Sequence, residues 1–468
     1  MGRQLQLPYR QGSISIGSLF SGIGGLEWGL EEAIEAAGRP AGTVFQVEIN
    51  PYSSAVLARH WPTVLRFGDV CRISSRTTGI APVSMLLAGS PCQDISVAAG
   101  LWGREGFRGR RSGLWSEADR LVGELEPDIF IWENVGGALG PIKDKKTKKI
   151  VSPAPIAIVL SDLHARGYDA WFTTALAASV GAQHLRLRVF VVAFRRDGVH
   201  IPAMRTSVLH RCDTRLDLTG SVWPAGPGHR PRKGEPQRQL LVHKGVVRFH
   251  KERIECDGNA VVPQCGFAVG SAAVSIYDWM SGNRAALTGL SRPREAYPLT
   301  PQGLASALTT EALGLITGAL PSREFVRIPS DQDWILCGER DRASSPLCRS
   351  FPGRGTMRSG IIMVPSGAPT PEEVEACRFE QCSELDPVDP SSLRLWPTAT
   401  ARDWRSGKSS AETRSRNSRP LNEVAAPNGY LNPDWVDGHM GFGAGFTYVA
   451  DPGFSEGRRG KPPKTSSK

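Results

Sequence analysis

The side chain with the most chemical potential in this sequence is a cysteine in a Pro-Cys turn. Cys92 follows Pro91 directly after the short apolar run 85–88, and the polar pair Gln93-Asp94 comes next. An isolated cysteine is commonly a buried small hydrophobe. A thiol that precedes a polar loop rich in glycine and arginine is instead placed to be exposed and reactive. The surroundings of Cys92 therefore favour a nucleophile.

Three charged residues could assist such a nucleophile. Glu133 follows the apolar run 129–132, where partial burial would raise the pKa of its carboxyl group and favour a protonated, acid role. Arg186 and Arg188 precede the run 189–193 and alternate in strand fashion, so both should point the same way. Two such guanidiniums suit a carbonyl oxygen or a phosphate. Taken singly, Glu133 could equally be a helix cap or an ion-pair partner, and the arginines could belong to a solvated strand edge.

A glycine-rich turn lies upstream, between an apolar run and a helical stretch. It consists of Phe20, Ser21, Gly22, Ile23, Gly24, Gly25 and Leu26. Glycines let a ligand approach main-chain N–H groups, although Glu27 breaks the dinucleotide pattern Gly-x-Gly-x-x-Gly. Glu48 and Asp69 end the next two predicted strands, where carboxylates can accept ribose hydroxyls and meet an adenine amino group. Together these features favour a nucleoside-bearing cofactor over an ordinary strand-to-helix turn.

Alternating strands and helices must position these groups. We predict strands at 14–20, 43–47, 85–88, 129–132 and 189–193, and helices at 26–37, 52–60, 114–125 and 156–165. This order is typical of an α/β fold with a mostly parallel sheet covered by helices. Ligands bind at the carboxyl ends of such strands, and the residues singled out above fall at those ends.

Composition narrows the partners and the compartment. The net charge of +10 favours a polyanionic partner such as nucleic acid. The nine cysteines include no Cys-x-x-Cys pair, so we expect reduced thiols and no bound metal. The N-terminus has no apolar signal segment and no run approaches the length of a membrane span, which predicts a cytoplasmic protein without membrane contact.

Taken together, these segments resemble those of the DNA (cytosine-5) methyltransferases, especially the bacterial and phage forms. The likeness covers roughly residues 13–195, and the matching segments occur in the family's order. The matching segments are 20–26, 47–50 and 68–70 for the cofactor, 89–93 for the nucleophile, 111–114 for the end of the catalytic loop, 133–135 for the acid, and 184–188 for the arginines.

The resemblance implies a Rossmann-like, S-adenosylmethionine-dependent methyltransferase domain that acts on double-stranded DNA. Cys92 would attack C6 of a flipped cytosine, Glu133 would activate N3, and Arg186 and Arg188 would hold O2 while C5 receives the methyl group. The implied cofactor-binding residues are Phe20, Gly22, Gly24, Gly25, Leu26, Glu48, Ile49, Asp69, Pro91 and Asn259. A monomer is expected, and a cognate restriction nuclease could accompany it. The alternatives are an RNA cytosine-5 methyltransferase of related fold and a DNA-binding relative without activity.

The second half of the chain departs from the family's pattern. The framework motif at 431–442 follows the Gly-Asn motif at 258–263, whereas in the family it usually precedes it. Ile49 stands where an aromatic residue often faces the adenine, and His184 stands where the arginine motif has Gln. The expected divisions are a cofactor-binding and catalytic domain (1–195), the start of a smaller, irregular target-recognition region (196–256), a helix returning to the catalytic domain (257–285), a target-recognition and framework region (286–450) and a basic, disordered tail (451–468).

Overall fold

The structure is a computed structural model of the whole chain. It describes residues 13–89, 113–143, 147, 150–152, 154–199, 209–218, 223–224, 242–243, 247–283, 300–318, 322–328, 333–336, 351–365, 395–407, 420–426 and 429–453. Pro91, Cys92 and the predicted basic tail beyond residue 453 lie outside the described residues.

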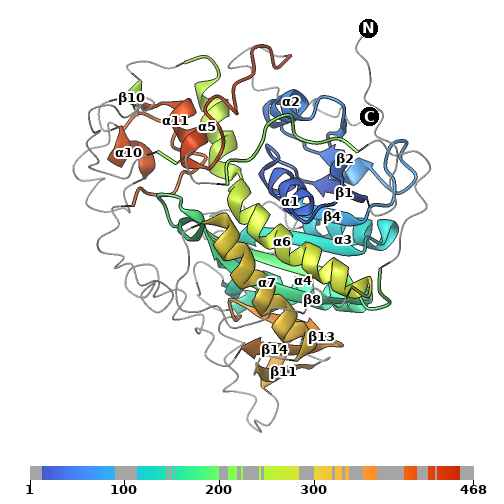
Figure 1. Cartoon of the computed structure of the whole chain (residues 1–468). Helices are drawn as coiled ribbons and strands as arrows, with labels where there is room; N and C mark the ends of the chain where they lie inside the picture. The colour runs from blue at the N-terminus through green and yellow to red at the C-terminus, as the bar shows by residue number, and fades with distance from the viewer. Residues whose placement is uncertain are drawn as a thin grey trace, which may run out of the picture.

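A single large sheet organises the described part of the chain (Figure 1). Its first half consists of five parallel strands in the order β3-β2-β1-β4-β5. The first strand, β1, lies in the middle; β2 and β3 are added on one side of it, and β4 and β5 on the other. These strands are β1 (Ile14–Leu19), β2 (Ala41–Val47), β3 (Leu65–Phe67), β4 (Met85–Gly89) and β5 (Ile129–Val135). Such an order defines a Rossmann-like sheet, whose switch point between β1 and β4 is a preferred place for ligands.

The second half of the sheet is antiparallel. Strand β9 (Leu187–Arg195) lies between β5 and β8 (Tyr168–Leu176) and runs against both. The sheet then continues from β8 through β13 (Gly355–Arg358), β14 (Ile361–Pro365), β11 (Ser322–Ile328) and β12 (Asp333–Leu336). Residues far along the chain therefore extend the sheet that the N-terminal region begins.

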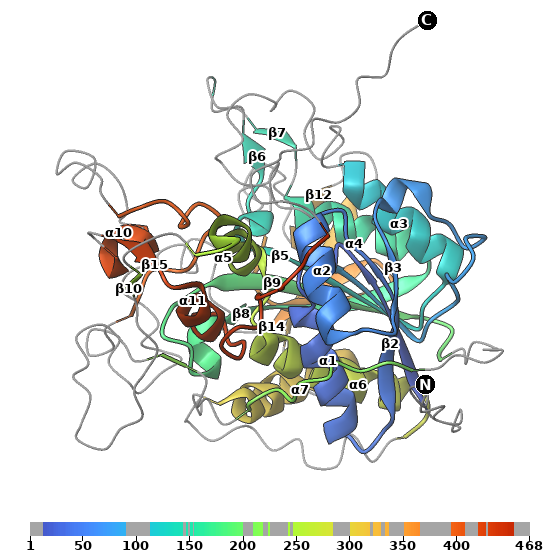
Figure 2. The same cartoon turned by 90° about the horizontal axis from the view of Figure 1, so that it is seen from above.

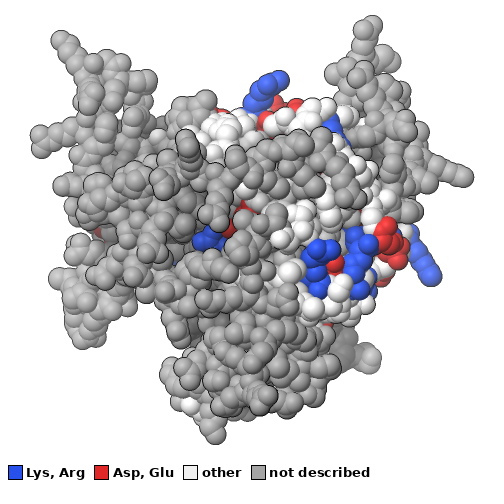
Figure 3. All heavy atoms as spheres, turned by 60° about the horizontal axis from the view of Figure 1, so that its bottom comes forward, with Lys and Arg blue, Asp and Glu red and all other residues white. Residues whose placement is uncertain are grey.

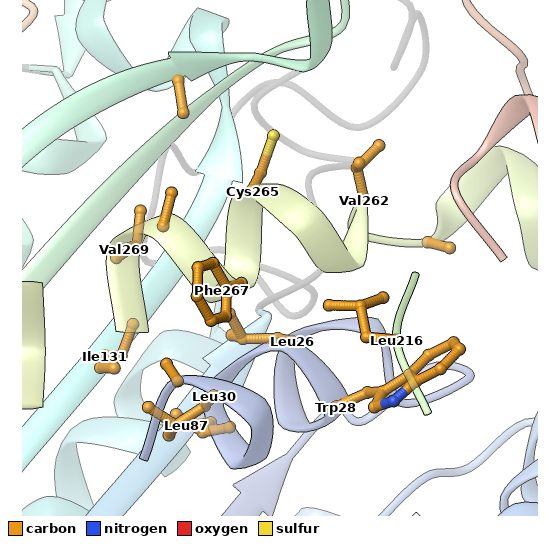
Figure 4. Packing of buried hydrophobic residues seen from close by; sticks show 14 of the residues in the cluster. Leu26, Trp28, Leu30, Leu87, Ile131, Leu216, Val262, Cys265, Phe267 and Val269 are labelled. Atoms are coloured by element: carbon orange, nitrogen blue, oxygen red, sulfur yellow. The ribbon is translucent and has the colours of Figure 1, made fainter. Parts of the chain in front are cut away.

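Helices cover both faces of the sheet. The strand residues alternate between the two cores, as β5 shows: Ile129 and Ile131 face one hydrophobic cluster, whereas Phe130 and Trp132 face the other. The first core receives α1 (Gly25–Ala36), α2 (Pro51–His60), α6 (Pro263–Met280) and α7 (Pro301–Thr317), and the second receives α3 (Gly113–Leu125) and α4 (Pro155–Ala165). Figure 4 shows α1 and α6 meeting through Leu26, Leu30 and Phe267.

Two expectations from the sequence need correction here. The single helix expected from residue 257 onward is two helices, α5 (His250–Asn259) and α6, because Pro263 begins α6 and holds the preceding residues extended. The region 286–430, expected to be irregular, contains α7 and four strands of the main sheet. Its apolar segments are short and widely separated, so they gave no regular alternation with helices.

A group of small elements packs beside the end of the sheet that carries α1 and α2 (Figures 1 and 2). It comprises α5, α10 (Leu421–Ala425), α11 (Pro433–His439) and a two-stranded sheet of β10 (Val242–His243) and β15 (Tyr430–Leu431). Aromatic contacts fix it there, because Phe446 stacks on Trp28 of α1 and Phe249 packs on Tyr52 of α2.

One helical stretch, His250–Met280, is long and apolar enough to span a membrane by composition, with a mean hydropathy of 1.4. In the structure 83% of its most apolar window is buried. Its α6 portion packs between the sheet, α1 and α7, which is typical of a core helix.

Candidate active site

The turn between β1 and α1 is tied to the end of β2 by a carboxylate. Gly22 N–H donates to Glu48 Oε2 at 2.7 Å, and Asn50 N–H donates to Glu48 Oε1 at 2.6 Å. Burial raises the pKa of Glu48, and the two backbone donors partly offset that effect. Gly22 and Gly24 both have positive φ, and a Cβ on Gly24 would lie 2.3 Å from the ring of Trp61. The glycines are therefore required by the shape of the turn itself.

Two further candidate cofactor residues lie next along the sheet edge. Ile49 is the most exposed large apolar side chain of the described residues, at 75%. Asp69 follows β3 and accepts a hydrogen bond from Cys71 N–H at 3.0 Å, which fixes the carboxylate at the start of a short 3-10 helix. Carboxylates at the ends of β2 and β3, with an uncovered apolar side chain beside the first, suit a ribose and an adenine.

Glu133 occupies the end of β5, next to the end of β4. Its neighbours in the sheet are Gly89 on β4 and Phe190 on β9. Glu133 is 7% exposed, and its Oε1 lies 3.0 Å from Arg188 Nε. Burial raises the pKa of Glu133, while Arg188 and then Arg186 oppose the shift. The sequence-based expectation of a raised pKa is confirmed in direction.

The position of Gly89 brings the nucleophile segment toward this carboxyl group. A Cβ on Gly89 would lie 3.8 Å from Glu133 Oε2 and 3.6 Å from the carbonyl oxygen of Phe20. Gly89 precedes Cys92 by three residues. The glycine turn, the acid and the last described residue before the Pro-Cys turn therefore meet at one point of the sheet edge.

Arg186 differs from the expectation. It precedes β9 and has a φ of 26°, so the strand alternation that was expected to align it with Arg188 does not extend to it. Its guanidinium donates to the carbonyl oxygens of Ala399 at 3.1 Å, Gly258 at 3.1 Å and Ala260 at 2.5 Å. At 4% exposure, it holds distant segments together.

The segment that joins α5 to α6 packs directly on the glycine turn. A Cβ on Gly25 would lie 2.2 Å from the carbonyl oxygen of Val261, so only glycine permits this approach. Asn259, the candidate cofactor residue of this segment, is the last residue of α5 and is exposed. The returning helix thus reaches the same end of the sheet as the other candidate cofactor residues.

The displaced framework motif also reaches this place. Phe442 lies 6.1 Å from Trp28 of α1, measured between ring centroids. Arg253 of α5 binds Asp434 Oδ1 at 2.5 Å and Asp437 Oδ2 at 3.0 Å, both on α11. Contacts in space therefore compensate for the unusual order of the motifs along the chain.

His184, which replaces the usual Gln, is a buried neutral histidine. Its Nε2–H donates to the carbonyl oxygen of His439 at 2.8 Å, and the two rings lie 4.3 Å apart. Burial lowers the pKa of His184, and burial lowers that of His439 to about 3. The hydrogen bond that a Gln amide could donate is thus supplied by an imidazole.

Sequence reasoning missed three buried acidic residues close to the site. Glu27, in the first turn of α1, is 1% exposed, and burial raises its pKa to about 7. Asp257 and Asp437 are both fully buried near Arg253, and burial raises the pKa of Asp437 to about 6. The sequence contained a sign of Glu27, because this acid interrupts the glycine pattern. Nothing in the sequence indicates the two aspartates, which are brought together only by the fold.

The basic character of the chain does not appear as a uniform patch on the face in Figure 3. There, the visible Lys and Arg side chains of the described residues lie beside Asp and Glu side chains. Ion pairs between described residues include Arg166 with Asp119 and Arg196 with Asp169.

Comparison with known proteins points to one family. Residues 14–223 match the family model "C-5 cytosine-specific DNA methylase". This part of the chain is therefore similar to the C-5 cytosine-specific DNA methylases. The matched region contains the glycine turn, Glu48, Asp69, Glu133 and both arginines.

Individual relatives match the same region. The type II methyltransferase M.NgoBV of Neisseria gonorrhoeae is 32% identical over 173 residues, which cover 37% of this chain and 39% of that protein. M.Sau3AI of Staphylococcus aureus, also a type II methyltransferase, is 26% identical over 221 residues, 45% of this chain and 50% of that protein. The chain thus matches half or less of the length of these relatives. The solved structure of a Spodoptera frugiperda DNMT2 mutant has a TM-score of 0.32 at 16% identity, covering 52% of this chain and 64% of that one.

Proposed function

We propose that the protein is a DNA cytosine-5 methyltransferase. The observation that carries the proposal is the Glu133–Arg188 pair, whose atoms lie 3.0 Å apart at the end of β5. The pair lies beside the end of β4, and β4 ends three residues before Cys92. A buried acid with a raised pKa, held by a guanidinium next to a nucleophile segment, suits activation of a pyrimidine ring.

The residues at the ends of β1, β2 and β3 fit S-adenosylmethionine, which supplies the methyl group. The main chain of Gly22 to Gly25 would receive the amino-acid end between Phe20 and Leu26, and Glu48 would accept the ribose hydroxyls. Ile49 would cover the adenine with its exposed side chain, and Asp69 would accept from the amino group. Pro91 and Asn259 would complete the site from the segments that flank it.

The chain's own residues would activate the base as follows. The Cys92 thiolate adds to C6 of a cytosine that has left the duplex, a displacement that costs a few kcal/mol. Glu133, in its protonated form, donates to N3 and so draws electron density toward N3, which opens C6 to attack by the thiolate. Arg188 holds Glu133 in place and faces the O2 side of the base. C5, which the addition at C6 has made nucleophilic, would take the methyl group of bound S-adenosylmethionine. Loss of the C5 proton and expulsion of Cys92 as the thiolate then release the product.

Arg186 receives a different role from the one first expected. Because its guanidinium is bonded to three backbone carbonyl groups, we infer that it positions the Gly258 segment and the segment around Ala399 against Arg188. It acts on the reaction through that packing rather than through contact with the base.

The partners follow from the same proposal. The substrate is duplex DNA, the protein acts as a cytoplasmic monomer, and a restriction nuclease of matching specificity could be its physiological counterpart. The parts of 196–256 and 286–450 outside the main sheet would choose the target sequence. The basic tail at 451–468 would stay outside the folded core.

A transfer assay tests the proposal. The full chain is incubated with methyl-labelled S-adenosylmethionine and either genomic duplex DNA lacking cytosine methylation or unmodified transfer RNA. We expect label in 5-methylcytosine of the DNA, and no label with Cys92→Ser. Label in transfer RNA alone would establish the RNA alternative, and DNA binding without transfer by the wild-type protein would establish an inactive relative.

A further inference from the structure

Two cationic side chains flank one tryptophan near the candidate active site, and two further arginines lie close to them along the chain. Lys251 Nζ of α5 lies 5.5 Å from the ring centroid of Trp404, and Arg405 Cζ lies 5.4 Å from the same centroid. Arg248 precedes Lys251 by three residues, and Arg402 precedes Arg405 by three residues. We call these four cations and Trp404 the Trp404 cluster.

The arginines of the Trp404 cluster have no acidic partner among the described residues. Arg248, Arg402 and Arg405 are exposed and form no ion pair there, whereas Lys251 pairs with Glu255 at 3.4 Å. Most other described arginines are bonded to carboxylates or backbone oxygens, as Arg166 and Arg253 are. Like charges gathered without counterions repel one another, so this arrangement is best explained by an anionic partner.

The acids nearby do not cancel the charge of the exposed arginines. Asp403 is 1% exposed and turns inward, where its Oδ2 accepts from Thr400 N–H at 2.7 Å. Glu255 is occupied by Lys251, and Glu252 is a partly buried residue of α5. The outward-facing charge is therefore mainly that of the three arginines.

The cluster is joined to the candidate active site by close backbone packing. A Cβ on Gly258 would lie 2.2 Å from Ala401 N, so the two segments that carry the cations touch each other. Arg186 bonds to both segments, through Gly258 O and Ala399 O, and lies two residues from Arg188. A ligand on the Trp404 cluster would thus flank the site that holds the base.

We propose that the Trp404 cluster is a docking site for the phosphodiester backbone of duplex DNA, on the side of the site formed by α5 and residues 395–407. This inference rests on the proposed function and adds to it the surface that receives the strand. Trp404 keeps two cations in place by cation–π contact, so little conformational freedom is lost when phosphates bind. The contacts are to backbone phosphates, so they position the duplex and do not read its sequence.

Salt dependence of binding tests the proposal. The affinity of the full chain for a duplex oligonucleotide is measured by fluorescence anisotropy over a range of KCl concentrations, for the wild type and R402A/R405A. Each lost phosphate contact lowers the slope of log K against log [salt] by about 0.9. We therefore expect the slope of the double variant to fall by roughly two, with weaker binding to every duplex sequence.

Matched variants separate charge from folding. R76A is the control: it removes an exposed arginine that forms no ion pair among the described residues. Arg76 follows Ser75, whose backbone N–H donates to Glu124 in the last turn of α3. The R76A variant should bind DNA as the wild type does. R402K/R405K keeps the charge and should retain the slope. If R402A/R405A fails to fold, the single variants R402A and R405A are each expected to lower the slope by about one.

The outcomes distinguish this inference from the proposed function. An unchanged slope in a folded R402A/R405A, with normal binding by the wild type, would overturn the docking site. So would weakened binding to poly-glutamate with unchanged binding to DNA, since that would indicate an acidic polypeptide as the partner. A wild-type protein that binds no DNA would instead contradict the proposed function itself.

Discussion

The two halves of the sheet are built in different ways. In the parallel half, β1 to β5 each end close to a residue that we propose to have a chemical role, and those residues follow one another along the chain. In the antiparallel half and the elements packed beside it, residues from 168 to 449 interleave: β13 pairs with β8, and Arg253 of α5 pairs with α11. The first half supplies reactive groups, and the second supplies the contacts that hold them.

This difference explains why the motif order along the chain can vary. The Gly258 segment, the segment around Ala399 and α11 are fixed by contacts to Arg186, Trp28 and each other rather than by short connections. Loop closure depends only weakly on the length of the connecting chain. A framework motif that follows the Gly-Asn motif can therefore occupy the place it needs.

The largest effect should come from the acid in the parallel half. Glu133→Gln removes the proton donor but keeps the shape of the side chain, so we expect methyl transfer to fall by roughly 10²–10⁴-fold. Single-turnover transfer to duplex DNA measures the effect. Glu117→Gln, at a partly buried residue of α3 that pairs with Arg120, is the control and should leave the rate unchanged. A Glu133→Gln enzyme with near-normal rate would show that the acid is structural.

The second half should respond in stability. Arg253→Met leaves Asp437 and Asp257 buried without their cation, which should lower the free energy of unfolding by about 3–5 kcal/mol. Urea denaturation followed by circular dichroism measures the loss. Arg59→Met is the control, because Arg59 is exposed and bonds only to backbone oxygens. Equal losses of unfolding free energy in the two variants would mean that the buried group of Arg253, Asp257 and Asp437 contributes no more than an exposed arginine does.

Stability should also depend on pH through Glu27. Burial raises its pKa from 4.5 to about 7, so the folded state favours the protonated carboxyl. The contribution of Glu27 to the free energy of unfolding is complete below pH 4.5. Up to about 3 kcal/mol of it is lost as the pH rises through 7. We expect Glu27→Gln to reduce the decline in stability across that window in urea titrations at several pH values. An identical pH profile in the variant would show that Glu27 ionises freely.

The smallest effect should come from restoring the family's residue at His184. A Gln amide can donate to the carbonyl oxygen of His439 as the imidazole does, so His184→Gln should change stability by less than about 1 kcal/mol. His184→Leu removes the donor and should cost about 1–3 kcal/mol. Thermal unfolding of both variants checks this order, and equal costs would argue that packing, not the hydrogen bond, decides the position.

The parallel half could be predicted from the sequence because its signals are local. Apolar runs, the glycine turn and the acids that end strands lie within a few residues of the features they indicate, and β1, β2, β4, β5 and β9 were found in this way. The strand β8 and the strands beyond it were missed, since nothing local shows that a segment near residue 357 pairs with one near 170.

The candidate site shows the same division. The places of Glu48 and Glu133 at strand ends followed from position along the chain, and the raised pKa of Glu133 followed from burial. The three carbonyl acceptors of the Arg186 guanidinium could not be predicted, because Ala399 and Gly258 are distant in sequence. That Cys92 is part of this site remains a prediction, which rests on the chemistry of the surrounding residues.

The most direct test of the central claim is covalent capture of the enzyme on DNA. The full chain is incubated with S-adenosylmethionine and duplex DNA in which 5-fluorocytosine replaces cytosine, so that the C5 proton needed for release is absent. We predict a denaturation-resistant protein–DNA adduct, mapped by peptide mass spectrometry to Cys92 and missing in Cys92→Ser. An adduct at another residue, or none on DNA that the wild-type protein binds and that contains its methylation site, would contradict the account.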